Sequence, residues 1–466
     1  MFKGIVAALV LMATVNVGSP AFPVDAADYR RTDYRILTLP PDRLPYNASA
    51  PGPLDGAGTF DEHGIAMRLV GGRKFDHPVF QAQFMLSRLS SYRLNRDPRY
   101  LARVEAHAQR LLGNAVSANG AIYFPYAFDW ALHHDTGDMM TAPWFSAMAQ
   151  GQALSAFVRL HAITRNPRYA TAAEKIFASF TVLRGGGSPW TTEIDAGYLW
   201  FEEYAKHPGP DRTYNGHIYA IYGLYDYFLS TRSATAKALM QGGITTVAAH
   251  LSNLRQPGWL SRYCRTHPQH GYVNYHADHV GQLYQLHRIT GDATFAVQAD
   301  RLIDDYPADQ AGGHGYLAAG SHEALHLDRD RRTVATRTFL LPAAQAVTVK
   351  SRHRVSGLAG VWLQIGSGTA AGYWVRELHP RAFIKLSVDT HDFIPRRLVT
   401  FRAGRYVGFA FDRYGLRTTP KPFRLREPSS AHATRRTVMN GATYFLIADG
   451  VWAGRWVPAQ PGLTLT

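Results

Sequence analysis

One unit of sequence recurs between about residue 76 and residue 305, and it limits what this part of the chain can fold into. In each copy an apolar stretch with helical spacing is followed by a polar turn with an aromatic residue, and then by an Ala-containing amphipathic stretch. Two turns carry Asp-Pro or Asn-Pro, which ends one helix and begins the next because proline is tolerated only at a helix start. The turns of the three clear copies are Tyr92–Tyr100, His161–Tyr169 and His287–Phe295. A looser fourth copy spans Tyr225–Leu251. The repeat predicts helical hairpins.

Repeated helical hairpins can stack as an open solenoid or close into an α/α toroid. The stretches between the hairpins are long and rich in Tyr, Trp, His and Gly, as expected of the rim of a pocket. We therefore predict a mainly α domain over residues 27–315, an incomplete α/α barrel of helical hairpins that forms a toroid.

A second, all-β region is predicted over residues 320–466. After Gly312–Gly315 the helical pattern gives way to short runs of β-branched and aromatic residues. These runs are Val334–Leu340, Ala346–Val349, Val361–Ile365, Phe383–Ser387, Leu398–Phe401, Tyr406–Phe411 and Tyr444–Ile447.

The β region contains an internal repeat, in which Gly372-Tyr-Trp374-Val375 returns as Gly454-Arg-Trp456-Val457. A doubled Gly-x-Trp-Val ending resembles the small SH3-like or Gly-Trp modules that tether secreted enzymes to cell envelopes. The resemblance implies binding to a cell wall or glycan. Tryptophans in the core of two β-sandwich edges explain the same repeat equally well.

The first 26 residues have the composition of an export signal. Lys3 precedes an apolar run from Ile5 to Val17, and Val24-Asp25-Ala26 has the small-x-small form of a cleavage site. The run of about 13 residues is too short to span a bilayer, and no later segment is longer. We expect a protein that is secreted, with no transmembrane segment, and association with the cell wall is one option.

The positive net charge of the chain restricts the kinds of molecule that it is expected to bind. Fifty Lys and Arg against 35 Asp and Glu give a formal charge of +15, and removal of residues 1–26 takes away one charge of each sign. Acidic partners are therefore favoured, and charge alone does not choose between an anionic polysaccharide and a cell-wall polymer. No nucleic-acid-binding motif is present. Cys264 is the only cysteine, so an intramolecular disulfide is impossible.

Four motifs in order resemble the C-terminal helical domain of the D-glucuronyl C5-epimerases. They are Pro143–Gln152, Trp200–Tyr204, Asn215–Asp226 and Asn274–Gln282, and the resemblance covers roughly residues 76–305. It implies a polysaccharide epimerase without a metal or other cofactor, acting on D-glucuronate units of an anionic polymer to give L-iduronate. Removing the C5 proton beside a carboxylate requires charge neutralisation, and inversion requires proton carriers on both faces of the sugar.

The resemblance also implies roles for individual residues. Glu203 and Tyr204 are expected to be catalytic on one face and Tyr275 on the other. Separately from the resemblance, the aromatic loop Tyr123–Trp130 is a candidate subsite wall, because aromatic faces stack on sugar rings, and it offers Tyr126 as an additional catalytic tyrosine. Gln150 and Gln152 are expected either to hold sugar hydroxyls or to support their helix. Tyr219, Tyr222 and Tyr225 are spaced as a core stripe with Asp226 as a helix-end partner. The predicted substrate-binding residues are Trp144, Gln150, Gln152, Asn215, Arg262, Tyr263, Arg265, His276 and His279.

Several alternatives stay open at this point. His276 and His279 have the spacing of a metal pair, but no third ligand follows at a defined distance, so no metal site is predicted. The relatives' Tyr-x-x-Arg does not align cleanly with Gly258–Arg265, which leaves Arg262 and Arg265 as alternative carboxylate partners. A uronate lyase would share the first chemical step, and a non-catalytic glycan-binding or envelope-binding protein would share the scaffold. The oligomeric state is undetermined, with a homodimer as one option.

Overall fold

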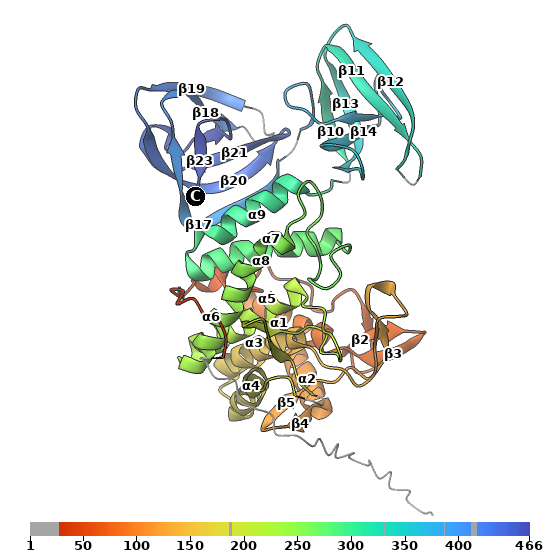
Figure 1. Ribbon diagram of the computed structural model, residues 1–466, viewed down its shortest axis with the longest axis vertical. Coiled ribbons are helices and arrows are strands. Elements are labelled where there is room, and N and C mark those ends of the chain that lie inside the picture. Colours follow the sequence, from red (N-terminus) through yellow and green to blue (C-terminus); the bar gives the residue numbers. More distant parts are fainter. Residues whose placement is uncertain (1–27, 186–188, 311, 330, 386, 412–416) are drawn as a thin grey trace, which may run out of the picture. The chain divides into compact units, whose positions relative to one another are not determined.

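The computed structural model describes residues 28–466 except 186–188, 311, 330, 386 and 412–416 (Figure 1). The predicted export signal, residues 1–26, lies outside the described residues. Within the described residues, none of the helices combines the length and apolar character needed to cross a membrane. The chain forms two compact units: unit 1 holds the residues before Arg31, Ala50–Pro210 and Tyr219–Gly242, and unit 2 holds Arg31–Ser49, Asp211–Ile218 and Gly243–Thr466. The division runs through the helical region.

The predicted helical hairpins are present (Figure 1). Unit 1 contains α1 (Pro78–Asn95) with α2 (Pro98–Asn114) and α3 (Ala147–Thr164) with α4 (Pro167–Ala178). Unit 2 contains α7 (Leu251–Leu254) and the hairpin of α8 (Val273–Thr290) with α9 (Ala293–Asp305). The helices α5 (Tyr214–Thr231) and α6 (Ala234–Ala249) each contribute residues to both units. Closure of the hairpins into a toroid involves both units and stays a prediction.

Three of the hairpin turns use one design. The first helix ends at a residue in the left-handed conformation, namely Arg96, Arg165 or Gly291. The next helix is then capped by a side chain that accepts a hydrogen bond from the backbone N–H two residues later, as Asp97, Asn166 and Asp292 do. The turn motifs of the sequence therefore work as paired stop and start signals.

Short strands connect the helices of unit 1. A three-stranded antiparallel sheet precedes α1, and two-stranded sheets follow α2 and α4. The strands are β1 (Thr59–Phe60), β2 (Ala66–Val70), β3 (Arg73–Asp76), β4 (Val116–Ala118), β5 (Ala121–Tyr123), β6 (Trp130–Ala131), β7 (Met139–Met140), β8 (Thr192–Asp195) and β9 (Tyr198–Phe201).

The helices α3 and α5 cross in close contact within unit 1. A Cβ placed on Gly151 would lie 2.5 Å from the Cα of Ala220, and one placed on Gly223 would lie 2.3 Å from the carbonyl oxygen of Gly151. The backbones touch because neither glycine carries a side chain. Beside this crossing Arg159 forms a buried ion pair with Asp226, at 2.8 Å.

The C-terminal β region consists of two seven-stranded antiparallel sheets with one strand order (Figure 1). The first is ordered β12-β11-β15-β14-β13-β10-β16 and the second β19-β18-β22-β21-β20-β17-β23, so each strand of one has a counterpart seven places later in the chain. We call them β modules 1 and 2. Their strands are β10 (Gly313–Leu317), β11 (Gly320–Leu327), β12 (Thr333–Leu341), β13 (Gln345–Arg354), β14 (Val361–Ile365), β15 (Trp374–Arg376), β16 (Ala382–Ile384), β17 (Ser387–Phe401), β18 (Gly404–Phe411), β19 (Arg417–Leu425), β20 (Ser429–Met439), β21 (Ala442–Ile447), β22 (Trp456–Pro458) and β23 (Leu463–Leu465).

The Gly-x-Trp-Val repeat marks the same hairpin in both modules. Leu363 pairs with Val375 in module 1, and Phe445 pairs with Val457 in module 2. Both glycines of the motif have positive φ and donate their N–H to an isoleucine carbonyl, Gly372 to Ile365 and Gly454 to Ile447. The tryptophans Trp362, Trp374 and Trp452 are at most 7% exposed and pack in the modules, whereas Trp456 of the second Gly-x-Trp-Val motif is partly exposed.

A buried charge network joins β module 2 to α8 and α9 inside unit 2. Asp300 of α9 forms ion pairs with Arg397 of β17 and Arg436 of β20, and it accepts a hydrogen bond from the hydroxyl of Tyr284 at 2.5 Å. Burial opposes ionisation of Asp300, but the two arginines outweigh it and lower its pKa. The last helical hairpin is therefore packed with this β module.

Candidate functional site

Two of the four sequence motifs lie side by side in unit 1. After β9, the carbonyl of Glu202 accepts the N–H of Ala147, the first residue of α3, at 2.7 Å. The N–H of Ala205 donates to the carbonyl of Phe145 at 3.3 Å. The backbone of Glu202–Ala205 therefore runs along the start of α3, which brings Glu203 and Tyr204 next to the Pro-Trp-Phe-Ser stretch.

Aromatic rings gather at this point. The ring of Tyr126 stacks on Trp144 with centroids 3.7 Å apart and an interplanar angle of 7°, and the ring of Tyr204 lies 5.9 Å from Trp144. The indole N–H of Trp144 donates to the carbonyl of Phe128 at 2.8 Å. Tyr219 packs partly buried against the same cluster, whereas Tyr222 is 4% exposed. In the predicted tyrosine stripe, Tyr222 is therefore buried, whereas Tyr219 contacts the aromatic cluster. Tyr219 is thus a site candidate, although its spacing in the sequence predicted a core residue.

Burial and a neighbouring charge determine the protonation state of Tyr126 in the aromatic cluster. Tyr126 is 1% exposed, and its pKa is raised above the ordinary tyrosine value, first by burial and then by the negative charge of Glu203. Its phenol is therefore protonated at neutral pH. Glu203 is also buried, at 7% exposed. A protonated phenol beside a carboxyl group can donate a proton or a hydrogen bond.

His77 is a second residue that the motifs did not reveal. It caps α1 by accepting the N–H of Phe80 at 3.2 Å, and its ring meets the edge of Tyr126 at 5.0 Å. Burial, and then the charge of Arg68, lower the pKa of His77 to about 3, so it is neutral. The only sequence signal was the His-Pro pair at the start of a helix.

The two glutamines of α3 have different surroundings. The amide of Gln150 accepts the N–H of Phe124 and donates to the carbonyl of Ile122 and the hydroxyl of Ser179. Gln150 therefore has the second of its two predicted roles, support of the helix. Gln152 is fully buried, and neither its amide oxygen nor its amide nitrogen has a hydrogen-bond partner. It keeps the capacity to bind a polar group.

The start of the third motif, up to Ile218, and the fourth motif lie together in unit 2. The N–H of Tyr214 donates to the carbonyl of Tyr263, and the N–H of Arg265 to the carbonyl of Arg212, both at 3.2 Å, so the two segments pair antiparallel. From α8, the amide of Gln282 donates to the carbonyl of Asn215 at 2.9 Å. The start of α5, the stretch around Tyr263 and α8 are thereby joined.

This second group contains three predicted site residues, namely Asn215, Tyr263 and Tyr275. The ring of Tyr275 lies 4.5 Å from that of Tyr263. Asn215 is fully buried, and both polar atoms of its side chain lack a hydrogen-bond partner. A buried amide without partners is costly, so it is suited to a ligand that supplies them.

Both predicted histidines are buried, and one is committed to the fold. The Nδ1 atom of His276 accepts the N–H of Ser261 at 2.8 Å, and Nε2 donates to the carbonyls of Leu302 and Tyr306 at 3.1 Å. His276 thus fastens α8 to α9, and its predicted role in substrate binding stays a prediction. His279 bonds the hydroxyl of Ser261 through Nδ1, while Nε2 has no partner.

The two candidate arginines differ in exposure. A guanidinium nitrogen of Arg262 donates to the carbonyl of Asn253 at 2.8 Å, whereas Arg265 is exposed. Burial raises the pKa of Tyr214, and the positive charges of Arg265 and Arg262 oppose that shift. Both stay candidates for the substrate carboxylate.

Asp278 is a carboxyl group near Tyr275 that sequence reasoning left without a role. It lies three residues after Tyr275 on α8, which is about one helical turn. Burial raises the pKa of Asp278 to about 6. A carboxyl group that titrates near neutrality can take up and release protons.

Three metal-ligating side chains of unit 2 also gather. The Nδ1 atom of His267 lies 3.5 Å from the sulfur of Cys264 and 3.8 Å from a carboxylate oxygen of Asp211. These are ligand types that zinc accepts. The set differs from the His276 and His279 pair considered in the sequence.

Residues 118–303 match the sequence model of the family described as "D-glucuronyl C5-epimerase C-terminus". The D-glucuronyl C5-epimerase of Caenorhabditis elegans is 28% identical over 177 residues, an alignment that covers 34% of this chain and 28% of that protein. The chain thus spans less than a third of that curated relative. The matched range contains all four motifs, which confirms the predicted family resemblance.

Among solved structures, similar helical proteins include cellobiose 2-epimerase from Bacillus thermoamylovorans and a sugar epimerase from a ruminal bacterium. The first is 10% identical with a TM-score of 0.40, covering 61% of this chain and 73% of the other. The second is 14% identical with a TM-score of 0.38, covering 57% and 68%. At these scores the likeness is too low to assign an activity or a closed toroid.

Proposed function

We propose that the protein is a secreted C5-epimerase of uronate-containing polysaccharides, because residues 118–303 match the family model described as D-glucuronyl C5-epimerase C-terminus. It converts D-glucuronate units within a polymer to L-iduronate. The observation that carries the proposal is the backbone pairing of Glu202–Ala205 with Phe145 and Ala147, inside the family-matched range. This pairing joins the motif with the proposed proton carriers to the motif with Trp144.

The proposed chemistry uses residues of both groups. Glu203 and Tyr204 remove or return the C5 proton on one face of the sugar, and Tyr275 serves the opposite face. Arg265 or Arg262 neutralises the C6 carboxylate, so that negative charge developing during proton removal is stabilised. Tyr126 acts as a proton or hydrogen-bond donor, because its raised pKa makes it a poor base.

Substrate contacts are proposed for the buried amides and for aromatic faces. Asn215 and Gln152 have amide atoms without partners in the fold and are suited to sugar hydroxyls. The ring of Trp144 is the proposed sugar contact in the first group, and the ring of Tyr263 is the one in the second. The Nε2 atom of His279 has no partner in the fold and is suited to a hydrogen bond with the sugar.

Solvent exchange tests the proposed epimerase. Incubation with a glucuronate polymer in deuterated water should place deuterium at C5 without forming unsaturated sugars. Tyr204→Phe and Tyr275→Phe should each lower the exchange rate at least about 100-fold, because they remove a proton carrier. Tyr169→Phe is the matched control and should retain activity, since the hydroxyl of Tyr169 on α4 bonds Glu105 on α2 at 3.5 Å.

Other outcomes of this assay identify the alternatives. Absorbance from unsaturated uronate would show a lyase, which shares proton removal but expels the C4 substituent. Polymer binding without exchange in the wild-type protein would favour a glycan-binding or envelope-binding role. The β region is proposed as the part that contacts the cell wall in that case, with Trp456 as its partly exposed tryptophan.

A further inference from the structure

A pocket in unit 1 lies outside the family-matched range. It is lined by residues of the loop before β1, by β1 and β2, and by α1, and its volume is about 550 Å³. The family match begins only at residue 118. The lining residues are Gly56, Ala57, Gly58, Thr59, Phe60, Ala66, Met67, Arg68, Leu69, Phe80, Gln83, Phe84 and Arg88.

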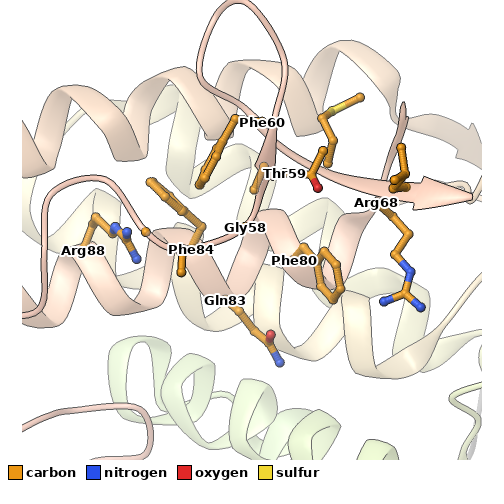
Figure 2. Close-up of a pocket in the computed structure, with 13 residues that line it drawn as sticks. Gly58, Thr59, Phe60, Arg68, Phe80, Gln83, Phe84 and Arg88 are labelled. Atoms are coloured by element: carbon orange, nitrogen blue, oxygen red, sulfur yellow. The ribbon is translucent and has the colours of Figure 1, made fainter. Parts of the chain in front are cut away.

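The charged lining is entirely cationic. Arg68 and Arg88 line the pocket, and none of its lining residues is acidic. In Figure 2 the two arginines stand at opposite ends, with the rings of Phe60, Phe80 and Phe84 between them. The pocket therefore presents two positive charges separated by aromatic surface.

Arg88 is a buried cation with unused hydrogen-bonding capacity. It is 6% exposed, and it donates to the carbonyl of Leu54 and the hydroxyl of Ser87, while its Nη2 atom has no partner. That atom borders the pocket, because a Cβ placed on Gly56 would lie 2.8 Å from it. Burial, and then the charge of Arg103, lower the pKa of Arg88 by more than Asp55 and Tyr100 raise it, so a further anion would favour the charged guanidinium.

Arg68 is held by aromatic rings without an ion pair. Its guanidinium lies 4.9 Å from the ring centre of Trp130 and 5.6 Å from that of Phe80. No described residue gives it a hydrogen bond or a carboxylate. The cation is thus positioned by its side-chain stem and by the two rings.

We propose that this pocket binds an anionic stretch of polysaccharide, whose carboxylate or sulfate groups pair with Arg68 and Arg88 while sugar rings pack on the phenylalanines. Sugar rings and aromatic faces are complementary in shape, and arginine forks match carboxylate and sulfate oxygens. The inference rests on the proposed function for the polymer's identity. The proposal gives residues before position 118, where the family match begins, a role in binding the same polymer.

The test measures binding, so that it does not depend on turnover. The full chain is titrated with a glucuronate polymer, with a sulfated polymer, and with the glucuronate polymer after its carboxyl groups are reduced to alcohols. Arg68→Ala should weaken binding of the anionic polymers about tenfold, and the reduced polymer should bind much more weakly. Arg73→Ala is the matched control, because Arg73 is an exposed arginine over a phenylalanine ring but lies outside the pocket lining.

The outcomes separate the two proposals. Equal effects of Arg68→Ala and Arg73→Ala, or tight binding of the reduced polymer, would overturn the pocket assignment. Phe60→Leu gives an independent check and should weaken binding by a smaller factor through lost ring contact. If the protein shows no C5 exchange but Arg68→Ala still weakens binding, the epimerase proposal fails and the pocket stands. Preference for the sulfated or the carboxylated polymer identifies the anion.

Discussion

Two glutamines on one helix show how neighbouring residues of one type come to differ in role. The side chain of Gln150 is enclosed by partners from β5 and the end of α4, whereas Gln152 has none. Replacing Gln150 by Leu would leave the N–H of Phe124 and the carbonyl of Ile122 without partners in a buried site. We expect this variant to lose about 3 kcal/mol of unfolding free energy.

Gln152→Leu is the paired substitution. It removes no hydrogen bond and replaces a buried amide by an apolar group, so the unfolding free energy should be unchanged within about 1 kcal/mol or should rise. Urea unfolding followed by circular dichroism measures both variants. A Gln152→Leu variant as unstable as Gln150→Leu would show that the amide is bonded within the fold.

A buried histidine predicts a loss of stability in mild acid. The Nε2 atom of His107 accepts the N–H of Ala66 at 3.1 Å, so it carries no proton, and burial lowers the pKa of His107 to about 4. The unfolded chain, with a histidine pKa of about 6.5, binds the proton more readily. Stability from His107 is therefore complete above about pH 6.5 and decreases as the pH falls towards about 4.

The contribution is measurable by comparing unfolding free energies at about pH 7 and about pH 5. His107 should account for a loss of up to about 2 kcal/mol between them. His107→Gln keeps an acceptor near Nε2 without titrating, so its loss on acidification should be smaller than that of the wild type. His63→Gln, at an exposed position, should keep the wild-type pH dependence. An unchanged slope in His107→Gln would contradict the assignment.

The contact between α3 and α5 depends on two glycines, Gly151 and Gly223. Replacing glycine by alanine should therefore destabilise the protein at this contact and stabilise it at an exposed helical position. Gly151→Ala places a methyl group 2.5 Å from backbone of α5, so the helices must separate. We expect a loss of about 3 kcal/mol. Gly281→Ala lies on an exposed part of α8 with open space around it and should gain about 0.5–1 kcal/mol from higher helix propensity.

Thermal and urea unfolding of the two variants tests the packing. The pair controls for the general effect of replacing glycine by alanine in a helix. A Gly151→Ala variant of wild-type stability would mean that the crossing is looser than the structure shows.

Local signals predicted the helical hairpins well, because each turn carries its own stop and start residues. Most β runs chosen from β-branched residues are strands, and Val361–Ile365 coincides with β14. Strand β19 was missed because it contains Pro420 and Pro422, which usually argue against a strand. It is tolerated because β19 lies at the edge of its sheet.

The site was predicted less completely than the fold, because long-range packing decides which polar groups stay open. Sequence alone could not distinguish Gln150 from Gln152, or assign His276 to a bond with α9. The tyrosine stripe predicted core packing, but Tyr219 packs against the Trp144 cluster. These outcomes depend on contacts between segments that are distant in sequence.

At the scale of the whole molecule, the formal charge of +15 favours capture of a polyanion. If the proposed substrate is correct, raising the ionic strength from about 0.05 M to about 0.5 M should raise the KM for a uronate polymer about tenfold. The kcat should change less than about twofold, because it describes the bound complex, whereas salt screens the long-range attraction that brings polymer and protein together. Initial rates of C5 exchange across a salt series measure both constants, and a KM that does not change would exclude a charge-driven capture step.

The shared strand order of the two β modules gives each position of one module a counterpart in the other. The paired hairpins supply a direct comparison: tryptophan stands at both Trp374 and Trp456, whereas Tyr373 and Arg376 correspond to Arg455 and Pro458. Identical pairs mark what the same architecture requires of both modules, and differing pairs mark positions at which that architecture accepts different side chains.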